Sequence, residues 1–235
     1  MLPASVARIH ERLGPDDLVL DIGGWYRPFN RADRVMDLMP YETRGEGGYE
    51  GWPEERFTAA DWIQRDICDR EPYPFADKEV DFVICSHTLE DVRDPIFVCS
   101  EMVRIAKAGY IEVPSRLEEQ SYGFQGPWAG WGHHRWLIEV HDNRIEFVFK
   151  HHVLHNRDSD RCPPGFRDAL PPERRVETLW WQDDFDYAER VFVSAEEFDP
   201  YLADFVARHR HEVSLPGPPS LARRVARRAR RAVRG

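Results

Sequence analysis

Two short apolar runs, DLVLDI at residues 17–22 and DFVICS at 81–86, limit the folds that this chain can adopt. Each run has the length of a β-strand and is flanked by turn residues, as expected of a strand that is buried on both faces. Strands of this kind are typical of a mostly parallel sheet that carries helices on its faces. We therefore expect an α/β fold.

The segments around these runs extend the pattern. Gly14-Pro15 ends a short helix, and Asp94-Pro95 offers an N-cap acceptor followed by proline at the first helical position. The expected elements are a helix over 5–13, strands at 34–38, 61–64 and 110–114, a long loop over 40–60, and a helix from Pro95 to about Gly109. Strands and crossovers in this order predict a doubly wound, Rossmann-like sheet.

The pattern changes after residue 135. WLIEVH and RIEFVFK flank Asp142-Asn143, a two-residue turn that favours positive φ, so residues 136–150 predict a β-hairpin. We expect seven strands in all, mostly parallel, with this hairpin as the antiparallel edge of the sheet.

Composition favours one principal domain. A chain of 235 residues with 42% hydrophobic content can bury one sizeable core, and we assign residues 1–213 to it. Residues 214–235 begin as a Pro/Gly/Ser linker and end in the Arg-rich segment LARRVARRARRAVRG. The cysteines lack the spacing of a disulfide framework, and we expect four reduced core thiols: Cys68, Cys85, Cys99 and Cys162.

The net charge of −10 is unevenly distributed, because the Arg-rich end offsets part of a more acidic body. An acidic body lacks the basic face that nucleic-acid binding requires. The chain has no run of eighteen apolar residues and no segment typical of a secretory signal, so we expect a cytoplasmic protein. The arginine tail is either a solvated terminus or a weak contact to an anionic membrane at its inner face. The oligomeric state is left open.

Polar residues and glycines follow each expected strand, where ligands bind in sheets of this type. They are Asp21, Gly23 and Gly24 after the first strand, Asp37 after the second, Asp66 and Ile67 after the third, and Ser86 and His87 after the fourth. A carboxylate that closes the second strand is suited to accept both hydroxyls of a ribose. The G-x-G-x-x-G pattern is absent, which argues against a pyrophosphate cofactor such as NAD or FAD.

The run PFADKEVDFVICSHTLEDVRDP at 74–95, within residues 66–115, resembles the middle of class I S-adenosylmethionine-dependent methyltransferases, of the type 11-like kind that acts on small molecules. With the first loop, the resemblance covers about residues 17–115. It implies S-adenosylmethionine as the cofactor, which has no pyrophosphate. It also implies roles for individual residues: Asp21, Gly23 and Gly24 line the methionine part, Asp37 holds the ribose, Asp66 and Ile67 contact the adenine, and Ser86 and His87 flank the sulfonium.

The chain departs from the family pattern at three places. The glycine loop is shortened to DIGGW and followed by Tyr26-Arg27-Pro28, so Trp25 could form an aromatic wall of the site. Asp91 replaces the usual histidine after Glu90, and the turn AKAGY at 106–110 lacks its proline.

The acceptor side of the site is less defined. The glycine- and aromatic-rich stretch within residues 116–136 is expected to hold the acceptor, either as a lid that closes over it or as a loop that covers the sheet edge. His87, His133 and His134 are the candidate catalytic bases, because the pKa of imidazole lies near working pH. The histidines between 133 and 155, with Cys162, lack the paired spacing of zinc sites, and we predict no metal.

These observations predict an enzyme, an S-adenosylmethionine-dependent methyltransferase acting on a small-molecule or glycan-type acceptor, with oxygen as the target atom. Two alternatives remain. One is a non-catalytic cofactor-binding or scaffold module of the same fold, with the shortened loop marking lost turnover. The other is a nicotinamide-dependent oxidoreductase or epimerase, against which the missing third glycine argues.

Overall fold

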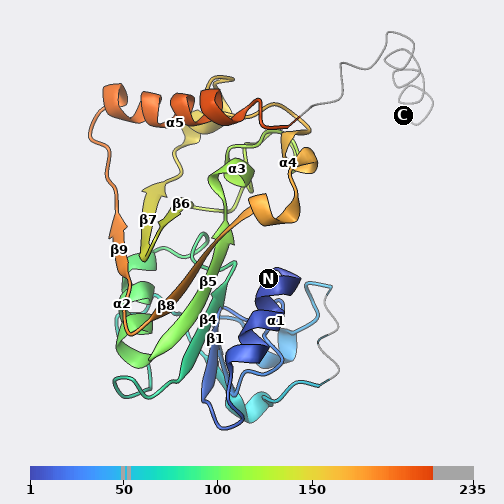
Figure 1. The fold of residues 1–235 in the computed structure, drawn as a ribbon, viewed down its shortest axis with the longest axis vertical. Helices are drawn as coiled ribbons and strands as arrows, with labels where there is room; N and C mark the ends of the chain where they lie inside the picture. The colour runs from blue at the N-terminus through green and yellow to red at the C-terminus, as the bar shows by residue number, and fades with distance from the viewer. Residues whose placement is uncertain (49–50, 52–53, 214–235) are drawn as a thin grey trace, which may run out of the picture.

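The computed structural model describes residues 1–48, 51 and 54–213, which form a six-stranded sheet and a separate three-stranded sheet (Figure 1). The larger sheet has the order β3-β2-β1-β4-β5-β8. Its strands are β1 (Val19–Ile22), β2 (Arg34–Asp37), β3 (Trp62–Gln64), β4 (Phe82–Ser86), β5 (Ala108–Pro114) and β8 (Val176–Gln182). The first five are parallel, and β8 runs antiparallel to β5. The α/β class and the parallel strands expected from the sequence are confirmed.

Helices cover both faces of the larger sheet. Successive residues of β1, Val19 and Leu20, belong to two different hydrophobic clusters, one on each face. On one face, α2 (Pro95–Ile105) buries an apolar stripe that includes Met102; on the other, α1 (Pro3–Arg12) buries Ile9. The α2 cap is as expected, because the Asp94 carboxylate accepts a hydrogen bond of 3.0 Å from the Phe97 amide.

The hairpin formed as predicted, but its place in the fold differs from the prediction. β6 (Trp136–His141) and β7 (Arg144–Phe149) pair with β9 (Asp186–Glu189) in the smaller sheet, and β8 occupies the antiparallel edge of the larger one. Within the described residues, the larger sheet therefore has six strands rather than seven. The hairpin is buried on both faces in this position. Phe147 packs into the main core, whereas Val148 packs against Leu202 of α5 (Ala195–His209).

The remaining elements are short. They are α3 (Arg116–Glu119), α4 (Phe166–Ala169) and the 3-10 helices Tyr41–Thr43, Ala59–Asp61, His152–His155 and Pro172–Arg174. All four cysteines are buried and free, as expected. No helix in residues 1–48, 51 and 54–213 is long and apolar enough to cross a membrane. The linker and arginine tail at 214–235 lie outside the described residues, so membrane contact stays a prediction.

Candidate cofactor and acceptor site

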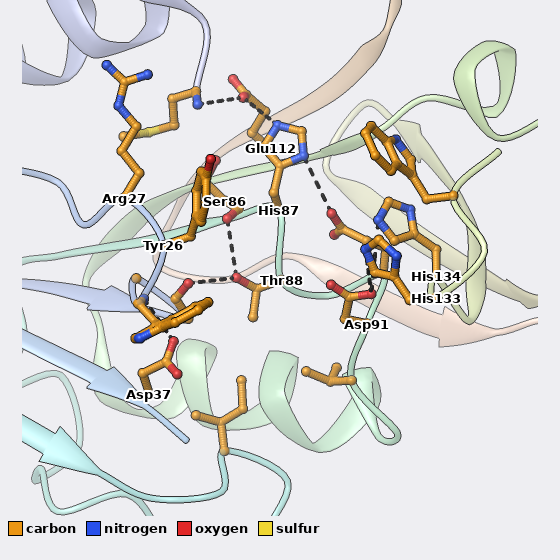
Figure 2. A pocket seen from close by; sticks show the side chains of 18 of the residues that line it. Tyr26, Arg27, Asp37, Ser86, His87, Thr88, Asp91, Glu112, His133 and His134 are labelled. Carbon is orange, nitrogen blue, oxygen red and sulfur yellow. Dashed lines mark hydrogen bonds and ion pairs between the residues drawn. The ribbon is translucent and has the colours of Figure 1, made fainter. Parts of the chain in front are cut away.

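One cleft of about 1160 Å³ lies at the carboxyl ends of β1, β2 and β4 (Figure 2). The strand order reverses between β1 and β4, and the ends of strands beside such a reversal are the usual ligand position in these sheets. All of the candidate residues chosen from the sequence line this cleft: Asp21, Gly23, Gly24, Asp37, Asp66, Ile67, Ser86, His87, His133 and His134. The structure therefore brings them together, while their individual roles stay predictions.

The two glycines of the first loop are required by close neighbours. Gly23 has φ of +77°, and a Cβ there would lie 2.1 Å from the Oγ1 atom of Thr88. A Cβ on Gly24 would lie 2.9 Å from a carboxylate oxygen of Asp21. Without these side chains the backbone turns sharply over the end of β1 and faces the cleft directly.

The two carboxyl groups of the first two strands are held by backbone amides. Asp21 is buried and accepts a hydrogen bond of 2.6 Å from the Phe29 amide. Burial raises the pKa of Asp21 to about 7, with a further contribution from Asp37 and against the effect of the Phe29 hydrogen bond. A bound cation would therefore favour the ionised form of this group, which is otherwise only partly ionised at neutral pH.

Asp37 is suited to a diol. Its two oxygens accept single hydrogen bonds, 2.9 Å from the amide of Trp25 and 2.8 Å from that of Met39. Burial raises the pKa of Asp37, although hydrogen bonds from the amides of Met39, Trp25 and Leu38 oppose this shift. A carboxylate has about four acceptor sites, so Asp37 can still accept a hydrogen bond from a ligand hydroxyl.

The adenine side contains partners that the sequence analysis missed. Arg93 forms an ion pair with Asp66, whose other oxygen accepts from the Cys68 amide at 2.9 Å. Burial opposes the shift, but the hydrogen bond from Arg93 lowers the pKa of Asp66. An adenine amino group would share this carboxylate with Arg93. Leu38 lines the same side and is 61% exposed, a large apolar surface for a ring.

His87 lies between two buried carboxylates. Its Nε2 is 3.1 Å from Glu112, and its Nδ1 is 3.5 Å from Glu90. Desolvation lowers the pKa of His87, but the hydrogen bonds to Glu112 and Glu90 outweigh it and raise the pKa to about 9. A pKa of about 9 favours the protonated imidazole at neutral pH, and the role of His87 as a base stays a prediction.

Glu112 explains this charge state. It stands in β5, is 1% exposed and also accepts from the Leu2 amide at 2.9 Å and from the Tyr110 hydroxyl. Burial opposes the shift, but the hydrogen bond from His87, together with these contacts, lowers the pKa of Glu112 to about 2. An acidic residue within the apolar run YIEVP was the sequence signal that could have identified it, since a buried carboxylate needs a partner.

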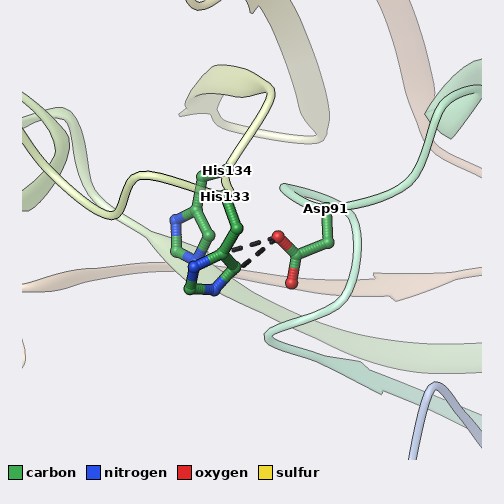
Figure 3. Close-up of side chains that lie close together, drawn as sticks. All are labelled: Asp91, His133 and His134. Atoms are coloured by element: carbon green, nitrogen blue, oxygen red, sulfur yellow. Dashed lines mark ion pairs between the residues drawn. The ribbon is translucent and has the colours of Figure 1, made fainter.

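His133 and His134 lie across the cleft, beside Asp91 (Figure 3). The two histidines differ in exposure: the side chain of His133 is 59% exposed and that of His134 is 7% exposed. His134 Nδ1 is 2.7 Å from Glu119, which also binds Lys150 at 2.5 Å. Both Nε2 atoms lie 4.0 Å from the same Asp91 oxygen.

The expected acceptor region at 116–136 only partly faces the cleft. Of its five aromatic side chains, only Trp131 lines it, and the indole donates to Glu118 at 2.9 Å. Residues 116–121 are buried instead, since Arg116 binds Glu139 at 2.6 Å and its guanidinium lies 3.9 Å from the Tyr201 ring centre. This part of the segment belongs to the packed interior.

One family model matches part of the chain. Residues 48–111 match the family model of a methyltransferase domain. No curated protein matches the chain. This match covers less than half of the chain; it agrees with the expected resemblance to methyltransferases and with S-adenosylmethionine as the cofactor.

Several solved structures are distantly similar. S-adenosylmethionine-dependent methyltransferases from Thermotoga maritima and Aquifex aeolicus are 20% and 16% identical, each with a TM-score of 0.33. An arsenic(III) methyltransferase from Chlamydomonas reinhardtii is 17% identical, with a TM-score of 0.31. These matches cover 51%, 53% and 49% of this chain and, in the same order, 53%, 69% and 50% of the matched chains. The chain thus spans about half the length of most of these structures.

Proposed function

We propose that this protein transfers a methyl group from S-adenosylmethionine to an oxygen atom of a small-molecule or glycan-type acceptor. The observation that carries the proposal is that one cleft holds both the residues suited to the donor, around Asp37, and a second polar group around His133. The cleft volume, about 1160 Å³, exceeds the roughly 300–1,000 Å³ of a typical small-molecule site. It therefore offers room for a donor and an acceptor side by side.

The chemistry needs little from the protein beyond placement. The acceptor oxygen forms a bond to the methyl carbon, the carbon–sulfur bond breaks, and the sulfonium becomes a neutral thioether as the acceptor loses its proton. Holding the two reactants in line gives effective molarities of about 10⁵–10⁸ M in favourable cases. The buried carboxyl groups Asp21 and Asp37 favour a cationic donor over its neutral product.

In this proposal, protonated His87 is held by its two carboxylate partners and supplies no hydrogen bond to the substrate. Its positive charge is balanced by Glu90 and Glu112, each 1% exposed, so the end of β4 carries no excess positive charge against the sulfonium. The proton of an acceptor hydroxyl would then leave toward the opposite wall, where Asp91 and His133 face the cleft.

Donor-labelled turnover tests this proposal. The protein is incubated with methyl-labelled S-adenosylmethionine and two matched acceptor panels, one of sugars and phenols and one of amines and thiols. We expect label in methyl ethers of the first panel only. Label exclusively in the second panel would contradict oxygen as the target, and tight donor binding without turnover on either panel would favour the scaffold alternative.

A further inference from the structure

We propose that Asp91, His133 and His134 bind one divalent transition-metal ion on the acceptor wall of the cleft (Figure 3). The two imidazoles and the carboxylate each offer one ligand atom, and these atoms all lie within 4.8 Å of one another. The three residues come from two segments that are distant in sequence, the end of β4 with its following turn and the loop before β6. The sequence spacing therefore gave no sign of the cluster.

The donor set selects a class of metal. Two imidazole nitrogens and one carboxylate oxygen suit zinc, iron, nickel or copper, whereas calcium and magnesium prefer oxygen ligands. Three protein ligands also leave coordination positions open, as in catalytic zinc sites. The open positions would face the cleft, which all three residues line.

A metal-binding histidine usually donates its other ring N–H to a carboxylate or carbonyl, and His134 has such a contact. Its Nδ1 donates to the Glu119 carboxylate at 2.7 Å, and Glu119 is held by Lys150 at 2.5 Å. This hydrogen bond fixes the tautomer, so the Nε2 lone pair points toward Asp91. The side chains of His134 and Glu119 are only 7% and 1% exposed, which keeps the ring in this orientation.

The distances require a modest closure around the ion. At a metal–nitrogen distance of about 2.0–2.1 Å, neighbouring ligand atoms of a tetrahedral site lie roughly 3.3 Å apart. The Asp91 oxygen is 4.0 Å from each Nε2 atom and all three ligand atoms lie within 4.8 Å of one another, so the ligand atoms must approach by up to about 1.5 Å. The side chains of Asp91 and His133 are 43% and 59% exposed and have room to move, whereas His134 is fixed.

A neighbouring charge also favours a cation here. Glu90 precedes Asp91, is 1% exposed, and its Oε2 atom has no hydrogen-bond partner among the described residues. A buried carboxylate oxygen without a partner is costly, and a nearby cation offsets part of that cost.

The role of the ion rests on the proposed function. An acceptor hydroxyl that binds the ion becomes more acidic and loses its proton to solvent, as metal-bound water does. The resulting oxygen then takes the methyl group, and S-adenosylhomocysteine leaves. Metal binding itself does not depend on this step and can be tested without turnover.

The test is calorimetric titration of untagged, chelator-treated protein with Zn²⁺, repeated with Co²⁺ while its visible absorption is followed. We expect one equivalent to bind, with the intense visible bands of low-coordinate Co²⁺. His133→Ala, His134→Ala and Asp91→Asn should each weaken binding by at least about 100-fold, and Glu119→Gln by about 10- to 100-fold. His152→Ala is the control, because His152 is also exposed and also adjoins another histidine. This substitution should leave Zn²⁺ binding unchanged.

Two results would overturn the inference: no stoichiometric Zn²⁺ binding by the wild type, or equal affinity in His133→Ala, Asp91→Asn and His152→Ala. Titration of each variant with S-adenosylhomocysteine separates a specific loss of Zn²⁺ binding from misfolding of the variant. Variants that lose Zn²⁺ but keep S-adenosylhomocysteine are folded, which supports the metal site. Zn²⁺ binding without any S-adenosylhomocysteine binding would overturn the proposed function and leave the metal site standing.

Discussion

The two walls of the cleft are built by different means. On the donor wall, backbone amides hold the carboxylates: Phe29 donates to Asp21, and Trp25 and Met39 donate to Asp37. On the acceptor wall, side chains hold one another, as in the chain from His134 through Glu119 to Lys150. Backbone geometry tolerates few changes at its tight positions, whereas a side-chain network can be altered one member at a time.

The largest effect is expected at the donor wall, in Gly23→Ala. The new Cβ would lie 2.1 Å from Thr88 Oγ1 at φ of +77°, so both overpacking and backbone strain oppose it. We expect a loss of roughly 2–5 kcal/mol of unfolding free energy in urea titrations. Gly48→Ala is the matched control, because its φ is +86° but its Cβ would meet nothing within 4 Å. Equal losses in the two variants would contradict the close packing of the first loop.

A smaller effect is expected from Asp37→Ala. Loss of two charge-assisted hydrogen bonds to the ribose should weaken S-adenosylhomocysteine binding by about 1.5–3 kcal/mol in calorimetry. Asp158→Ala, whose side chain is 94% exposed, serves as the control and should bind normally. An unchanged dissociation constant in Asp37→Ala would remove this residue from the donor wall.

His87, at the end of β4, predicts a dependence of stability on pH. The pKa of His87 in the folded state, about 9, lies above its ordinary value of about 6.5. Its contribution is therefore complete below pH 6.5 and is lost as the pH rises to 9. Because the side chain is 44% exposed and its ion pairs are screened, we expect a change on the order of 1 kcal/mol.

Thermal or urea unfolding across this pH range measures the effect. His87→Asn removes the titrating group while tolerating the positive φ of 53° at this position, so its stability should vary less between pH 6.5 and 9. A wild-type curve that matches that of the variant would show that His87 is not held between Glu90 and Glu112 as described.

The same contrast explains what could be predicted from the sequence. The donor residues follow their strands directly, so locating β1, β2 and β4 located Asp21, Asp37 and Ser86 as well. The partners of His87 and those on the acceptor wall could not be found in this way. Glu112 is 25 residues from His87, and Lys150 is 31 residues from Glu119, so only the folded chain shows which carboxylate meets which cation.

For the fold as well, features with a local sequence signal could be predicted and long-range pairings could not. Short apolar runs and caps placed the parallel strands and α2, because their signals are local. β8 escaped detection because it pairs with β5, from which it is separated by the whole hairpin region. α5 was not predicted because it contains Pro200 in its interior, and proline disfavours a helix at such a position. Here the burial of Leu202 and Val206 supports the helix.

Calorimetric titration with S-adenosylhomocysteine, with NAD as the comparison ligand, tests the central claim most directly. The donor wall described above predicts micromolar or tighter binding of S-adenosylhomocysteine at one site and no measurable binding of NAD, since no third glycine or following helix is present to receive a pyrophosphate. Binding of NAD in preference to S-adenosylhomocysteine would contradict the assignment of this cleft to a methyl donor.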